Sequence, residues 1–177
     1  EPEALGGRVE VQLHQSPGRY NGILHPSLFS AGVLNAVQSY NGGSALLPMA
    51  FPEGSPTHPA YTAGHATVAG ACVTILKAFF DTENTVIPNP VVPNATGTAL
   101  VPFSGPALTV EGELNKLASN VATGRDIAGV HWRSDSFASL RLGQAIAASV
   151  LRDHKRLFNE DGVSFNFRGF DGNRIII

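Results

Sequence analysis

The chain contains 177 residues, of which 43% are hydrophobic and 15% are charged, so it has the length and apolar content of one domain with a core. The 12 basic and 14 acidic residues give a formal net charge of −2, and the basic residues are scattered. This distribution excludes the positive patch that a nucleic-acid-binding protein needs. No apolar stretch is long enough for a membrane span. We therefore predict a soluble protein and leave a secreted or periplasmic location open.

Residues 1–55 are rich in Gly, Pro, Ser and Asn, which predicts a mostly irregular but ordered segment. One short helix is expected at Pro26–Ser39, with its apolar residues on one face. The sequence does not begin with Met, and its first residues look like the inside of a motif. We therefore expect it to be part of a longer protein.

The first long helix is predicted at Thr62–Phe80, with Thr62 as its N-cap. Apolar residues recur at helical spacing, and Ala and Gly fill the other faces, which is typical of a helix packed on several sides. The residues expected to be buried are Val68, Cys72, Ile75, Leu76 and Phe79. Cys72 is the only cysteine, so an intramolecular disulfide is excluded and a small buried thiol is expected.

The remaining sequence predicts a mainly α fold in a single domain spanning residues 1–177. Residues 82–106 indicate a long connection with short extended pieces. Further helices are expected at Val110–Gly129 and Ser134–Phe158, with acidic residues in the first turn of the former and basic residues near the end of the latter. The alternating tail around residues 170–173 predicts a C-terminal β-hairpin.

Two stretches carry residues suited to binding an oxyanion. Gly64 and His65 stand at the start of the first long helix, where unpaired backbone N–H groups and the helix dipole favour an anion. In the stretch GRDIAGVHWRSD, Arg125 lies six positions before His131, and Asp135 lies four positions after it. Arginine offers a fork of donors, histidine can act as nucleophile or metal ligand, and aspartate can orient the imidazole.

A single histidine or arginine is more often an ordinary polar residue than a catalyst. For this reason His14, His25 and His154 carry no functional prediction. The spaced Arg, His and Asp residues, together with a Gly-His pair at a helix start, favour one oxyanion site more strongly than any of these residues alone.

The stretches PTHPAYTAGHAT and GELNKLASNVATGRDIAGVHWRSD resemble the second and third signature motifs of the vanadium-dependent haloperoxidases, in particular the bromoperoxidases. More distantly, they resemble the type 2 phosphatidic acid phosphatases. The likeness is strongest from about Phe51 to Arg141. It implies the helical-bundle fold of the vanadium haloperoxidase and acid phosphatase type, with this chain forming the C-terminal catalytic part of a longer haloperoxidase.

The resemblance also implies a role for each matching residue. His131 is expected to bind vanadium, and Arg125 to donate to the vanadate oxygens. Gly64 and Ala63 belong to the backbone that lines the cofactor, and His65 is expected to act as the acid or base beside it. The resemblance assigns halide handling to His58, and the spacing of Asp135 from His131 predicts that this carboxylate orients the imidazole.

Three departures from the family pattern bear on these roles. Ala63 replaces the serine of the second motif, and Gly124 replaces the serine that usually precedes the arginine of the third. The first motif, a lysine followed by Arg-Pro, is not present in this sequence. Its end resembles EPEALGGR, with Glu1 where the arginine is expected, and a carboxylate at that position would repel vanadate.

The resemblance implies a vanadate-dependent enzyme that uses hydrogen peroxide to oxidise a halide, with bromide as the expected substrate. The product would be a hypohalous-acid equivalent that halogenates small organic acceptors. Vanadate is the implied cofactor, and a homo-oligomer is expected because a chain of this length leaves apolar faces exposed. Two alternatives stay open: a phosphatase with His131 as nucleophile, and a non-catalytic fragment, which Glu1, Ala63 and the missing lysine favour.

Overall fold

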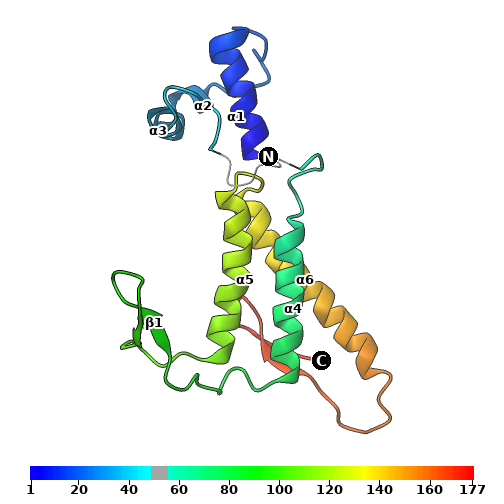
Figure 1. The fold of residues 1–177 in the computed structure, drawn as a ribbon. Coiled ribbons are helices and arrows are strands. Elements are labelled where there is room, and N and C mark those ends of the chain that lie inside the picture. The colour runs from blue at the N-terminus through cyan, green and yellow to red at the C-terminus, as the bar shows by residue number, and fades with distance from the viewer. Residues whose placement is uncertain (49–55) are drawn as a thin grey trace. The chain divides into compact units, whose positions relative to one another are not determined.

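A computed structural model describes residues 1–48 and 56–177 of the chain (Figure 1). The chain divides into two compact units. The first unit comprises Glu1–Ala63 and Thr123–Ser136, and the second comprises Gly64–Ala122 and Phe137–Ile177. The secondary structure is mainly α, as predicted, and no helix in the described ranges is long and apolar enough to cross a membrane. The single domain expected for residues 1–177 stays a prediction.

The N-terminal segment is largely helical, so the prediction of a mostly irregular segment is wrong; residues 49–55 lie outside the described residues. Helix α1 spans Pro2–Glu10, and a π-helical stretch, η1, continues it over Val11–Gln15. Proline suits the first turn of a helix, where its missing N–H is not needed. The adjacent glycines lower the intrinsic helix propensity. Gly6 is required by packing, since a Cβ there would lie 2.9 Å from the carbonyl oxygen of Ala45.

The helix expected at Pro26–Ser39 forms as two pieces, α2 at Ser27–Ser30 and α3 at Gly32–Tyr40. Ala31 separates them with an extended backbone, at φ −76° and ψ 136°. The core of this unit is apolar and small. It contains the buried residues Val9, Leu24 and Ala45, packed against Leu5, Tyr20, Leu28, Phe29 and Leu34.

The second unit is built on three long helices. Helix α4 spans Gly64–Phe79, α5 spans Val110–Ile127, and α6 spans Arg133–Lys155 (Figure 1). The first thirteen residues of α5 and all but the first four of α6 belong to this unit. All three lie close to their predicted ranges. Because α4 begins at Gly64, its N-cap position falls on Ala63 and not on Thr62.

The buried face of α4 differs from the predicted one. Its buried residues are Ala66, Gly70, Val73, Thr74 and Lys77. Cys72 is exposed, as are most of the large apolar side chains expected inside, so both predictions are wrong. Small residues are buried because the backbones of α4 and α6 approach closely. A Cβ on Gly70 would lie 2.3 Å from the carbonyl oxygen of Leu140, and one on Gly143 would lie 2.1 Å from that of Thr67.

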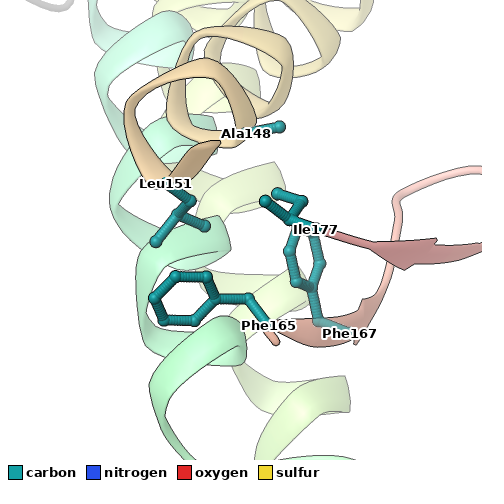
Figure 2. Packing of buried hydrophobic residues seen from close by; sticks show 5 residues of the cluster. All are labelled: Ala148, Leu151, Phe165, Phe167 and Ile177. Carbon is teal, nitrogen blue, oxygen red and sulfur yellow. The ribbon is translucent and has the colours of Figure 1, made fainter. Parts of the chain in front are cut away.

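The predicted C-terminal hairpin is confirmed and supplies part of the core. Strands β3 (Asn166–Arg168) and β4 (Arg174–Ile176) are antiparallel, with Phe167 paired to Ile175. Figure 2 shows side chains from this hairpin and the end of α6 packed together. The buried members of this cluster are Ala148, Leu151, Phe165, Phe167 and Ile177. The predicted extended pieces in residues 82–106 form a second hairpin of β1 (Val91–Pro93) and β2 (Leu100–Pro102).

A buried ion pair joins α4 to the first turn of α5. Lys77 is 3% exposed, and its Nζ lies 3.6 Å from Oε1 of Glu111. The same Nζ donates a hydrogen bond of 3.2 Å to Oδ1 of Asn115. Burial lowers the pKa of Lys77 below its ordinary value of 10.5, although the carboxylate of Glu111 opposes the shift.

Candidate functional site

His131 lies in the short connection between α5 and α6. The end of α5 is closed by backbone hydrogen bonds from Gly129 N–H to Asp126 O, 3.0 Å, and from Val130 N–H to Arg125 O, 3.3 Å. Gly129 has φ +74°, the left-handed conformation in which glycine commonly ends a helix. The first turn of α1 also contacts this connection, since Glu3 N–H donates to Gly129 O at 3.1 Å. These contacts fix the backbone immediately before His131.

Two polar contacts fix the backbone after His131. Oγ of Ser136 donates a 2.7 Å hydrogen bond to Oδ1 of Asp126, which ties the start of α6 to the end of α5. Oδ2 of Asp135 accepts a 3.0 Å hydrogen bond from the N–H of Trp132, the residue before the helix. This is the reciprocal half of a capping box, in which a side chain in the first turn accepts from the N-cap backbone.

His131 itself is 3% exposed. Its Nδ1 lies 3.9 Å from Oδ2 of Asp135, a distance longer than a hydrogen bond. Among the described residues, no hydrogen-bond partner reaches Nδ1 of His131. The Asp135 oxygen nearest to His131 therefore accepts from the backbone N–H of Trp132 and places its charge beside the ring without a hydrogen bond to it.

The ring of His58 stacks on that of His131. The ring centroids are 6.3 Å apart and the planes are inclined by 29°. Nδ1 of His58 lies 2.8 Å from the carbonyl oxygen of Pro59. A carbonyl can only accept, so Nδ1 is the protonated nitrogen and the neutral ring keeps a free acceptor at Nε2. The side chain of His58 is 57% exposed, so this ring has a path to solvent that His131 lacks.

Glu1 places a buried carboxylate beside this pair of rings. Its side chain is 5% exposed, and Oε1 lies 4.0 Å from Nδ1 of His58. That oxygen has no hydrogen-bond partner within residues 1–48 and 56–177. We call Glu1, His58, His131 and Asp135 the histidine cluster; it consists of two acids and two imidazoles and lies entirely in the first unit.

The other predicted site residues are found at the ends of helices. Arg125 is in the last turn of α5, is half-buried, and belongs to the first unit, as does the fully buried Ala63. Gly64 and His65 are exposed and form the start of α4, in the second unit. A Cβ on Gly64 would meet nothing within 4 Å, so the backbone there is open to a ligand. That Gly64 and His65 act with His131 stays a prediction.

Sequence reasoning missed the residues that support His131. Asp126 and Ser136 are joined by a hydrogen bond but stand ten positions apart, and neither was singled out as a site residue, although Asp126 lies within the stretch GRDIAGVHWRSD. Their signal in the sequence is a polar residue at each end of a short connection between two helices. Within the described part of the chain, no group of three or more His, Cys, Asp or Glu side chains is arranged to hold a metal ion.

Residues 34–160 match the family model described as the VCPO second helical-bundle domain. A vanadium-dependent bromoperoxidase of Corallina officinalis is 52% identical over 193 residues, and one of Ascophyllum nodosum is 41% identical over 181 residues. These alignments cover 99% and 97% of this chain, but 32% of each relative. The chain therefore spans about a third of the length of the curated relatives that it matches.

A solved structure shows the same fold. It is the second vanadate-dependent bromoperoxidase of Ascophyllum nodosum, which is described as homohexameric. The TM-score is 0.80 at 37% sequence identity, and the match covers 99% of this chain and 35% of that one. The predicted helical-bundle fold is confirmed by this similarity.

Proposed function

The chain belongs to the family of the VCPO second helical-bundle domain, and on that premise we propose that it carries the oxyanion site of a vanadate-dependent haloperoxidase. The observation that carries the proposal is the buried His131, held between two helix ends and stacked on His58. The bromoperoxidases similar to this chain are vanadium-dependent by name. The proposal extends that dependence to this chain.

The chemistry of the donor groups fits a tetrahedral oxyanion. The imidazoles of His58 and His131 and the guanidinium of Arg125 all belong to the first unit, and each can offer an N–H group or a positive charge to an anion. The buried carboxylate of Glu1 opposes an anion through its charge, at 4.0 Å from His58. The set therefore fits best an oxyanion that still carries a proton, because its hydroxyl group could donate to a carboxylate.

We assign each residue the role that its chemistry supports. His131 binds the vanadium of vanadate, and Arg125 offsets the charge of its oxygens. The N–H of Gly64, at the open start of the 16-residue helix α4, donates to the anion, and Ala63 supplies the preceding backbone. His65 exchanges protons with the substrate.

His58 and Asp135 assist from either side of His131. The exposed ring of His58 relays protons to solvent and handles the halide, since it stacks on His131 and keeps a free Nε2 in its neutral form. Asp135 holds the segment of His131 through its hydrogen bond to the backbone of Trp132. Arg125, by contrast, supplies positive charge from the end of α5.

The proposed reaction is the oxidation of a halide, with bromide as the preferred one, by hydrogen peroxide. Vanadate, when bound, supplies a Lewis acid that activates the peroxide without a change in its own oxidation state. The product, a hypohalous-acid equivalent, then halogenates a small organic acceptor. The contribution of the protein is to hold the anion, balance its charge and move protons at the imidazoles.

A halogenation assay tests this proposal. The full chain is mixed with hydrogen peroxide, bromide and a phenolic dye, with and without added vanadate, and a phosphomonoesterase assay runs on the same preparation. We expect bromination that requires vanadate and is abolished in His131→Ala. His154→Ala is a matched control, because His154 is exposed in the last turn of α6.

The other possible results of these two assays support different functions for the chain. Phosphatase activity that is lost in His131→Ala and inhibited by vanadate would support the related phosphatase in place of the peroxidase. Bromination that persists in His131→Ala would refute the assigned role of His131. Inactivity in both assays would support a chain that is not catalytic by itself.

We also propose that the chain assembles as a homo-oligomer. Large apolar side chains are exposed on and just after α4, including Val68 at 62%, Phe79 at 57% and Phe80 at 66%. Several large apolar side chains exposed on one helix and its end favour a protein partner. The similar bromoperoxidase of known structure is described as homohexameric. A molar mass from light scattering that equals one chain at all concentrations would contradict this part of the proposal.

A further inference from the structure

Oε1 of Glu1 is a buried acceptor without a hydrogen-bond donor in the part of the chain that the structure describes. The side chain is 5% exposed, and no group among residues 1–48 and 56–177 donates a hydrogen bond to this oxygen. Burying such an oxygen without a partner is unfavourable. A buried, unpaired acceptor at a proposed binding site is a reason to look for a ligand that donates.

The nearest imidazole does not meet this need. Nδ1 of His58 lies 4.0 Å from Oε1 of Glu1, which is too long for a hydrogen bond. Its proton is directed to the carbonyl oxygen of Pro59, at 2.8 Å. The face of the ring lies against His131, with centroids 6.3 Å apart. Glu1 therefore offers an unused acceptor next to a ring that stacks on the proposed anion-binding histidine.

Oxyanions of similar shape differ in whether they can donate to such an acceptor. At neutral pH, phosphate and vanadate retain at least one hydroxyl group, whereas sulfate retains none. A carboxylate can accept a hydrogen bond from the hydroxyl group of phosphate or vanadate. Sulfate has no such donor, so the carboxylate only repels it through its charge. Discrimination of this sort is strong, because the wrong ligand leaves a buried group unpaired.

From these observations we infer that Glu1 makes the site selective for tetrahedral oxyanions that carry a hydroxyl group, by accepting a hydrogen bond from that hydroxyl. The inference rests on the proposed function, since it requires an oxyanion at His131. It also removes the conflict between a buried acid and an anionic ligand. The charge of Glu1 weakens binding of every anion, but it penalises the protonated ones least.

Calorimetric titration of the full chain at neutral pH, with inorganic phosphate, vanadate and sulfate in turn, tests the inference. We expect phosphate and vanadate to bind at least about tenfold more tightly than sulfate. Glu1→Gln keeps the shape of the side chain but replaces one acceptor oxygen with an NH2 donor. It should strengthen sulfate binding and reduce the preference for phosphate by about tenfold or more.

Two control variants isolate the effect of Glu1. Glu160→Gln removes the same unit of charge from an exposed position and should keep the wild-type preference. Glu3→Gln alters a carboxylate in the first turn of α1 that also has a buried oxygen without a partner among the described residues. A preference that falls only in Glu1→Gln supports the inference, whereas an equal fall in Glu3→Gln overturns the assignment to Glu1.

The remaining outcomes separate the inference from the proposed function. Equal affinity of the wild-type chain for phosphate and sulfate overturns the inference and needs no variant, so a folding defect of Glu1→Gln does not block the test. A preference unchanged in folded Glu1→Gln also overturns it. If the wild-type chain binds none of the anions, or if His131→Ala binds them all as tightly, the proposed function fails and the inference fails with it.

Discussion

Oδ2 of Asp135 lies 3.9 Å from Nδ1 of His131 while it accepts a 3.0 Å hydrogen bond from the backbone of Trp132. One carboxylate thus closes the start of α6 and places a negative charge beside the buried ring. The spacing in the sequence predicts that Asp135 supports His131. The structure shows a second contribution beside the charge, because the hydrogen bond from Trp132 holds the backbone segment that follows His131.

Replacement of Asp135 separates these contributions. Asp135→Ala should lower the free energy of unfolding by about 1 kcal/mol, the usual cost of losing a side-chain cap. Asp135→Asn keeps an oxygen that can accept from the N–H of Trp132, so its free energy of unfolding should fall much less. Denaturant unfolding of both variants provides the comparison, and equal losses would show that the hydrogen bond to Trp132 contributes little.

The close approach of α4 and α6 makes a second prediction. In Gly70→Ala the added methyl group would lie 2.3 Å from the carbonyl oxygen of Leu140, so the two helices must separate. We expect a loss of at least about 2 kcal/mol in the free energy of unfolding, because overpacking at a backbone contact cannot relax cheaply.

Gly7→Ala is the control for this substitution. Gly7 lies within α1, and a Cβ there would meet nothing within 4 Å. Replacing a helical glycine with alanine in open space should raise stability by about 0.5–1 kcal/mol. If Gly70→Ala were as stable as Gly7→Ala in thermal unfolding, the glycine contact would not be a determinant of helix packing.

The sequence predicted the long helices well and their buried faces poorly. Helical periodicity and capping residues are local signals, which is why the end of α4 was predicted to within one residue of Phe79. Its buried face was wrong because burial depends on the neighbouring helix. Gly70 and Gly143 select a close approach, and the large side chain of Val68 is left at 62% exposure.

The candidate site likewise combines features that are visible in the local sequence with contacts that only the structure shows. Arg125, His131 and Asp135 lie within eleven consecutive residues, so their association is visible in the sequence. The stacking of His58 on His131 and the burial of Glu1 beside His58 join residues far apart in the chain. No periodicity encodes such contacts. Glu1 was singled out only as a departure from a motif, and its unpaired oxygen is visible only in the structure.

The buried Lys77 leads to a third prediction, which concerns the pH dependence of the free energy of unfolding. Burial lowers its pKa in the folded chain, while the unfolded chain keeps the ordinary value of 10.5. Between these two values the unfolded state binds the proton more strongly, so the contribution of Lys77 to the free energy of unfolding rises with pH. Below the folded-state pKa, Lys77 contributes a constant penalty.

Comparison with Lys77→Met measures this effect. The variant lacks the titrating amino group of Lys77. Urea unfolding at increasing alkaline pH should therefore give a difference, wild type minus Lys77→Met, that grows in favour of the wild type until about pH 10.5. A difference that stays flat or declines across that window would contradict the account of a lysine held in its charged form against the cost of burial.

Binding of vanadate at His131 is the central claim, and direct titration tests it without requiring turnover. Calorimetry with orthovanadate should give saturable binding to the full chain and to His154→Ala, and at least about 100-fold weaker binding to His131→Ala. Equal binding by wild type and His131→Ala, with both proteins folded, would contradict the claim.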